Sequence, residues 1–346
     1  MMTIDANVYW LPETFFTDAA IRDRFQALVN AQPDTRATFE QVDGIGKWMI
    51  EKPIGQGSLD YFENDYRLET QLSDMDTANV DVAILKAPGC QEWFDLSMCQ
   101  WYNQQVAEHI SKSHGRMCGL ATVPPDGTPE SLAELDHCIH DYGFVGVQVS
   151  AHYENRYLDD PKFRAFFKHV EALNIPAYVH HTPVPVEYEA IKQYPNFRRS
   201  YGRCADQIIA ISRELFSNLF EDCPHLIMIH SMLGGGYFTY KDMFMPHDSG
   251  NGRFDTASSD QIATRLAHNI YYEVSHAQPW GLDNLNIAVK QLGADHVIYG
   301  SSYPVKQVWM TKGPSFMAKA LNPDDLQQVM SGNAERLYGR KGDVNG

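Results

Sequence analysis

The sequence predicts a single (β/α)8 barrel, and three observations support that fold class. Eight short runs rich in apolar and β-branched residues are spread along the chain, at 3–8, 80–86, 117–123, 145–150, 177–182, 226–231, 270–275 and 297–302. These runs are nearly continuous in apolar residues, as parallel strands buried on both faces are. Longer segments with helical periodicity lie between them. Eight such alternations in one unbroken order favour a closed barrel over the alternative, a doubly wound sheet.

The segments between the runs carry helical signals. In 65–80, Leu68, Leu72 and Met75 fall on one face, and the pattern in 131–143 ends at the helix-stopping Gly143. Asp160 stands before a proline, which is typical of an N-cap followed by the first helical turn. Further helices are expected in 206–222, 279–293 and 323–339.

Composition limits the classes of partner. The chain has 346 residues and a formal net charge of −16. So acidic a balance argues against a nucleic acid or an anionic membrane as partner, since both require basic patches. No apolar run reaches the ~18 residues of a membrane span, and the N-terminus does not read as a signal peptide. Six scattered cysteines without a C-x-x-C pair suggest free thiols, so we expect a cytoplasmic protein.

Two excursions exceed a minimal βα unit. Residues 12–62 follow the first strand and contain one expected helix at 17–31, and residues 183–203 follow the fifth strand. Both leave from strand ends on the face where barrel active sites lie, so we expect a lid or a subunit contact from 12–62. We expect 1–346 to form one domain, with 341–346 as a flexible tail.

The strand ends supply the candidate site, because barrel chemistry comes from residues at the C-terminal ends of strands. If the barrel is correct, strands five, six and seven aim histidine rings at one pocket. Taken in strand order, the candidates are Asn7 and Tyr9, Lys86, His180 and His181, His230, His276, and Ser302.

Several longer motifs point to a family. The stretches YGFVGVQVS, RYLDDPKFRAFF, NIPAYVHHTP, FEDCPHLIMIHSMLGGG and GADHVIYGSSYP occur in this order along the chain. In that order and spacing they resemble the amidohydrolase-related branch of the amidohydrolase superfamily, which includes aminocarboxymuconate-semialdehyde, resorcylate and carboxyvanillate decarboxylases. The resemblance runs from residue 3 to about residue 338.

The resemblance implies a divalent metal site, usually of zinc or manganese, but most of its positions are substituted. The family places His-x-His or Glu-x-His on strand one, a histidine on strand five and an aspartate on strand eight. Here Asn7, Tyr9 and Ser302 stand at three of these positions, and only His180 is retained. Amide, hydroxyl and phenol groups are poor ligands for these ions. We therefore predict no cofactor, with a rebuilt zinc or manganese site of His180, His230 and His276 as the alternative.

The remaining groups suggest acid–base chemistry. Histidine titrates nearest neutrality, so we expect His230 to act as general base, with His180 or His276 as its acid partner. Tyr9 and Asn7 would donate hydrogen bonds to a developing oxyanion.

The resemblance also implies a small carboxylate substrate, aromatic or derived from ring cleavage. The candidate anchors for it are Lys86, Arg198, Arg199 and Arg203, and His181 and Ser302 would help to position it. We expect a metal-independent hydrolase. The alternatives are a non-oxidative decarboxylase of an aromatic acid and a catalytically inactive binding protein. Family habit further suggests a homodimer.

Overall fold

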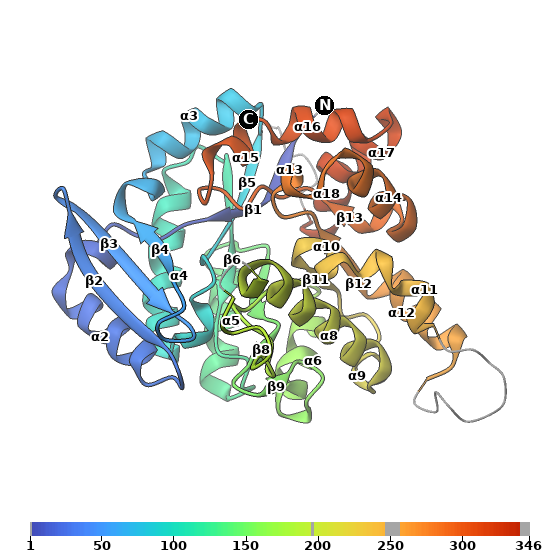
Figure 1. Ribbon diagram of the computed structural model, residues 1–346, viewed down its shortest axis with the longest axis horizontal. Coiled ribbons are helices and arrows are strands. Elements are labelled where there is room, and N and C mark those ends of the chain that lie inside the picture. Colours follow the sequence, from blue (N-terminus) through green and yellow to red (C-terminus); the bar gives the residue numbers. More distant parts are fainter. Residues whose placement is uncertain (1, 195–196, 246–256, 340–346) are drawn as a thin grey trace.

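Eight parallel strands form one sheet that closes into a barrel (Figure 1). The computed structural model describes residues 2–194, 197–245 and 257–339. The first and last strands of the sheet meet where Ala6 N donates to Tyr299 O at 3.0 Å and Tyr9 N donates to Tyr303 O at 2.7 Å. In sheet order the strands are β1 (Ile4–Tyr9), β5 (Val82–Lys86), β6 (Met117–Thr122), β7 (Gly146–Ser150), β10 (Ala177–His180), β11 (Met228–His230), β12 (Ile270–Glu273) and β13 (Val297–Ile298).

The prediction of a (β/α)8 barrel is therefore confirmed. Each of the eight predicted runs overlaps one of the eight strands, in the same order. Sequential strands are neighbours throughout, and every pairing among them is parallel.

Helices surround the barrel and follow the strands in turn. The longer ones are α3 (Leu68–Ala78), α4 (Leu96–Ser111), α5 (Pro129–His140), α6 (Arg164–Ala172), α8 (Arg203–Phe216), α12 (Ser259–His268) and α14 (Leu282–Leu292). Shorter helices are α9 (Leu219–Asp222), α10 (Ser231–Gly236), α11 (Lys241–Phe244), α13 (Ala277–Trp280), α15 (Gln307–Thr311), α16 (Gly313–Ala320), α17 (Pro323–Gln327) and α18 (Asn333–Leu337). Asp160 caps the turn η3 (Pro161–Phe163), which leads into α6 as its sequence signal indicated. Nowhere in the described chain is a helix both long and apolar enough to cross a bilayer.

The excursion after β1 differs from the prediction of one helix. It contains α1 (Thr14–Thr17), α2 (Ala19–Asn30) and an antiparallel sheet of β2 (Arg36–Val42), β3 (Ile45–Glu51) and β4 (Ser58–Phe62), and it ends in the turn η1 (Glu63–Tyr66). Alternate residues of β3 are buried, so Trp48 packs on Phe15 and Phe25 of the two helices. Figure 1 shows this sheet and α2 to one side of the barrel.

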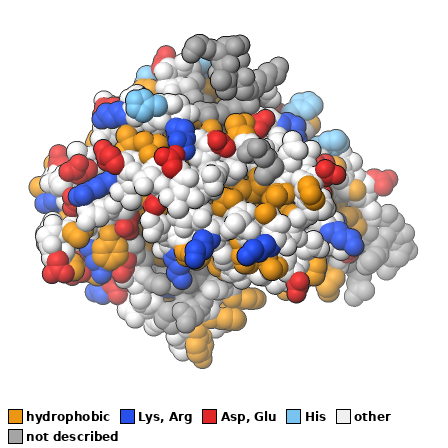
Figure 2. Space-filling view, turned by 90° about the horizontal axis from the view of Figure 1, so that it is seen from above, with side chains coloured by type: hydrophobic (Ala, Val, Ile, Leu, Met, Phe, Trp, Pro, Cys, Tyr) orange, Lys and Arg blue, Asp and Glu red, His pale blue; other side chains and the backbone are white. Residues whose placement is uncertain are grey.

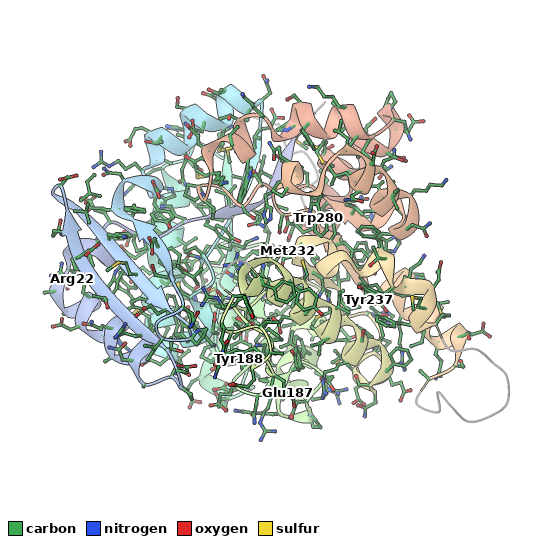
Figure 3. The ribbon with its side chains drawn as sticks, viewed as in Figure 1. Arg22, Glu187, Tyr188, Met232, Tyr237 and Trp280 are labelled. Carbon is green, nitrogen blue, oxygen red and sulfur yellow. The ribbon has the colours of Figure 1, made fainter. Side chains whose placement is uncertain are left out.

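The excursion after β10 contacts the first one. Arg198 is 2 % exposed and donates to the backbone oxygens of Lys52, at 2.5 Å, and Gly57, at 3.2 Å. Tyr188, labelled in Figure 3, donates its hydroxyl proton to Asp34 at 2.9 Å. Arg198 thus joins the two excursions, which corrects its assignment as a substrate anchor, and the side chain of Arg199 lies outside the described residues. A lid function for these excursions stays a prediction, and the predicted tail lies outside the described residues.

Two hydrophobic clusters fill the fold. A large one lies between the strands and their surrounding helices, and a small one lies inside the barrel and includes Ile4, Ile84, Tyr178 and Ile229. The barrel interior is therefore packed, and the space for a ligand lies beyond the C-terminal ends of the strands. Figure 2 shows acidic and basic side chains intermixed with hydrophobic ones on one face of the molecule.

Candidate active site

A pocket of about 400 Å³ opens at the C-terminal ends of the barrel strands. It is called the reaction pocket below. Strand β1 contributes Tyr9, and the end of β10 contributes His180 and His181. The first residue of α8, Arg203, faces the same space. The first excursion completes the wall with residues of β4 and η1, among them Tyr61, Asp65 and Tyr66.

Tyr9 and His180 form a hydrogen-bonded pair in this pocket, with 2.9 Å between the tyrosine hydroxyl and Nε2. Burial raises the pKa of Tyr9, so its phenol keeps its proton and can donate it to Nε2. Burial also holds the pKa of His180 well below its ordinary value, and the charges of Lys86 and Arg203 lower it further. The ring is therefore neutral, and when Nε2 accepts from Tyr9 its proton is on Nδ1, a buried atom with no hydrogen-bond partner.

His181 stacks on His180 with 4.1 Å between ring centroids. Its Nδ1 lies 3.2 Å from the hydroxyl of Ser231, which also accepts its backbone N–H at 3.1 Å. Burial, and then the neighbouring ring of His180, hold its pKa well below the ordinary value. Both rings are therefore uncharged near neutral pH.

Arg203 is the one lysine or arginine among the described residues that line the reaction pocket. Its position depends on how closely α10 packs against the start of α8. Gly235, at φ +71°, allows this approach, because a Cβ there would collide with the carbonyl oxygen of Cys204. With both histidines neutral, Arg203 supplies the positive charge of the pocket.

Asp65 is a site residue that the sequence analysis missed. It lies in η1, at the end of the first excursion, and faces the reaction pocket. Burial raises its pKa from 3.8 to about 6. It is therefore partly protonated near neutral pH, as a proton donor must be. No signal in the sequence marked it, since it stands in a segment without a barrel strand.

The floor beneath the pocket is a buried polar network around Asn7. The pairing of β1 with β5 shifts register between Asp5 and Val8, which turns Asn7 inward. Its Nδ2 lies 2.9 Å from Glu273 Oε2 and 3.1 Å from the hydroxyl oxygens of Ser275 and Ser302. The Tyr178 hydroxyl donates to the same Glu273 oxygen at 2.7 Å. Asn7 and Ser302 therefore lie below the pocket wall and not on it.

Lys86 is also below the pocket. It is fully buried, with Nζ 3.4 Å from the centre of the Tyr178 ring and 3.5 Å from Ala6 O. Burial lowers its pKa to about 7, although the charges of Glu273 and Asp5 oppose that shift. It does not line the reaction pocket, which corrects its assignment as a substrate anchor.

The side chain of His230 points away from the reaction pocket. Side chains alternate along a strand, and Ile229 occupies the inward position, so His230 points outward to α8. Its Nδ1 lies 2.9 Å from Gln207 Oε1 and its Nε2 lies 2.8 Å from Glu214 Oε2. Both ring nitrogens are thus occupied in a fully buried environment, and the expected role of general base does not fit this placement.

His276 lies beside the pocket and outside its lining. Its ring stacks on Trp309 at 4.4 Å, and its Nδ1 lies 3.4 Å from the Ser302 hydroxyl. Burial lowers its pKa to about 3.

Of the residues predicted from the sequence, four line the reaction pocket: Tyr9, His180, His181 and Arg203. Asp65 lines it as well.

The barrel, with a pocket at the C-terminal ends of its strands, defines the class of protein as a (β/α)8 barrel of the kind that enzymes use. Residues 91–340 match the family described as Amidohydrolase. This is more than half of the chain, so the protein belongs to that family, and the resemblance inferred from the motifs is confirmed.

Individual relatives are more distant. Gamma-resorcylate decarboxylase of Rhizobium sp. (strain MTP-10005) is 23% identical over 289 residues, which cover 78% of this chain and 86% of the relative. The 2-amino-3-carboxymuconate-6-semialdehyde decarboxylase of Dictyostelium discoideum is 25% identical over 248 residues, covering 70% and 67%. The structure of 5-carboxyvanillate decarboxylase from Sphingomonas paucimobilis superposes with a TM-score of 0.75 at 19% identity, covering 98% and 99% of the two chains.

These relatives are decarboxylases, that is, carbon–carbon lyases of the superfamily. The prediction of an enzyme of the hydrolase or lyase type agrees with this finding. They favour the decarboxylase alternative over the hydrolase that we expected. The predicted homodimer and cytoplasmic location stay predictions.

The prediction of no cofactor is contradicted. Structural neighbours are described with bound manganese, namely a dihydroxybenzoic acid decarboxylase from Polaromonas sp. JS666 and a 5-carboxyvanillate decarboxylase from Novosphingobium aromaticivorans. The side chains at the family's metal-ligand positions, Asn7, Tyr9 and Ser302, are poor ligands for manganese. Among the described residues, no group of three or more His, Cys, Asp or Glu side chains could hold a metal, since His230 faces α8. We derive no chemical step through manganese.

Proposed function

We propose that the protein is a non-oxidative decarboxylase of a small aromatic carboxylic acid. One observation carries the proposal: a guanidinium and a carboxylic acid with a pKa of about 6 face the same pocket. The relatives named above support the same reaction class.

The walls of the pocket suit an aromatic ring. Tyr61 and Tyr66 are 6 % and 7 % exposed and line the space, and Tyr61 is fixed by donating its hydroxyl proton to Pro88 O at 2.8 Å. A pocket of about 400 Å³ accommodates a substituted benzoate. Arginine presents parallel N–H groups that match a carboxylate, so Arg203 would orient the acid.

Decarboxylation replaces the carboxylate on the ring carbon with one proton, so the site must supply a proton donor. Asp65 would donate its proton to the ring carbon that bears the carboxylate. The electrons of the carbon–carbon bond then return to the ring as carbon dioxide leaves, and the Asp65 carboxylate regains a proton from water. The hydrogen-bonded pair of Tyr9 and His180, which lines the pocket, would donate a hydrogen bond to an ortho oxygen of the substrate.

The test is product analysis. The purified full-length protein is incubated with a panel of ortho-hydroxybenzoates, including 2,6-dihydroxybenzoate, with and without added manganese. Carbon dioxide and the matching phenol in equal amounts support the proposal. A hydrated or hydrolysed product, or no turnover on any member, would contradict it, and the second of these outcomes would favour the binding protein.

A further inference from the structure

We propose that a second pocket, on the side of the barrel mouth nearest α2, binds a small aromatic amine in its ammonium form. This pocket has a volume of about 760 Å³. It is lined by the turn η2 (Gln91–Trp93), by loops after β6 and β10, by β8 (His152–Tyr153) with the turn that follows it, and by the segment directly after α2. The proposal is independent of the decarboxylase assignment.

Two buried acceptor atoms at this pocket have no hydrogen-bond partner. Gln91 is 4 % exposed, and its Nε2 donates to Ser150 Oγ at 2.7 Å, which fixes the amide. Its Oε1 has no partner, nor has Oε1 of the adjacent Glu92. Buried acceptors of this kind are normally satisfied, because a missing hydrogen bond is unfavourable. A ligand that enters beside these residues and donates hydrogen bonds would satisfy both acceptors.

The charge around the pocket favours a cation as that donor. Four acidic residues line it against two lysines; they are Asp34, Glu92, Asp126 and Glu154, against Lys52 and Lys162. Burial raises the pKa of Glu92, and the charges of Lys52 and His152 oppose that shift only in part, so a bound ammonium group would further stabilise the carboxylate form.

The remaining surface favours an aromatic body on the ligand. Trp93, Phe94, Tyr153 and Phe163 line the space, and the first two follow Glu92 directly in the chain. Aromatic faces also attract cations, so these walls suit an ammonium group attached to a ring.

The second pocket is distinct from the reaction pocket, and no residue lines both. Pro88 and Gly89 line the reaction pocket, whereas Gln91 and Glu92 line the second one. Cys90, between them in the chain, is fully buried. A ligand can therefore occupy one pocket without filling the other.

The test is isothermal titration of the full-length protein with 2-phenylethylamine, compared with the uncharged 2-phenylethanol. The amine should bind saturably and the alcohol at least about tenfold more weakly, since charged hydrogen bonds are the stronger ones. Glu92→Gln should weaken amine binding about tenfold or more, whereas Lys52→Gln, which removes a competing cation, should strengthen it. Because Lys52→Gln predicts a gain, a folding defect cannot imitate it.

Two matched controls locate the binding. Asp65→Asn removes an acid of the reaction pocket, and Glu69→Gln removes one from an exposed position on α3. Both should leave amine binding unchanged. Four results would overturn the proposal. They are no saturable binding, equal binding of the alcohol, loss of binding in Asp65→Asn with Glu92→Gln unaffected, and saturable binding that changes in neither Glu92→Gln nor Lys52→Gln.

Discussion

Replacing Asp65 with asparagine separates its proposed chemistry from any effect on folding. Asparagine has a similar shape but no proton to donate to carbon, so the rate of decarboxylation should fall. General acids typically contribute about 10²- to 10⁴-fold, and we expect a loss of kcat in that range. In the wild type the acid form reacts, so the rate should be level below a pH of about 6 and fall about tenfold per pH unit above it.

The same substitution should raise the free energy of unfolding near neutral pH while it lowers the rate. The pKa of Asp65 is raised from 3.8 to about 6 in the folded chain, so the folded state favours the protonated acid. Stability from this group is complete below a pH of about 4 and is lost as the pH rises through about 6. Two pKa units correspond to about 3 kcal/mol for a fully buried group. Asp65 retains contact with solvent, so about 1 kcal/mol is more realistic. At pH 7, Asp65→Asn should therefore be more stable by about that amount.

The assay follows phenol formation from pH 5 to 9 in the wild type, Asp65→Asn and Asp65→Glu, together with urea unfolding at pH 7. We expect the glutamate variant to retain part of the activity and a falling pH profile. Wild-type activity in Asp65→Asn, or an unchanged pH profile, would refute the assignment of Asp65 as the acid.

Three further variants test the other site residues. Arg203→Gln should raise KM for an aromatic acid about 10- to 100-fold with a smaller change in kcat, because a charged hydrogen bond of about 1.5–3 kcal/mol is lost; steady-state kinetics would contradict this if only kcat fell. Tyr9→Phe leaves His180 Nε2 without its donor, so urea unfolding should show a loss of about 1–3 kcal/mol. His230→Ala should destabilise the protein by about 2–4 kcal/mol and leave kcat/KM of the folded enzyme within about threefold. A loss of kcat/KM above 100-fold in stable His230→Ala protein would restore His230 as a catalytic base.

The barrel could be predicted from the sequence because its strands are buried on both faces. Such strands are continuous apolar runs, and eight of them in order leave few other folds. The sheet of the first excursion gave no comparable signal. Strand β2 is mostly exposed and β3 is only half buried, so polar residues interrupt both. That sheet packs through Trp48 on Phe15 and Phe25, contacts that local periodicity does not reveal.

The site was harder to predict than the fold. Tyr9 and His180 follow strand ends and could be placed, but the direction of His230 depends on one residue of register, since neighbouring side chains of a strand point to opposite faces. Asp65 enters the pocket from an excursion whose path no local pattern indicates. Lys86 was correctly placed on a strand. That its side chain is buried in the barrel interior beneath Tyr9 depends on how the interior packs, which the sequence does not reveal.

The most direct test of the proposed reaction uses an ortho-hydroxybenzoate labelled with ¹³C in the carboxyl group, turned over in D₂O. The account predicts release of labelled carbon dioxide and one deuterium in the phenol, at the carbon that lost the carboxylate, with both signals reduced together in Asp65→Asn. Label retained in an organic product, or a phenol without deuterium at that carbon, would contradict it.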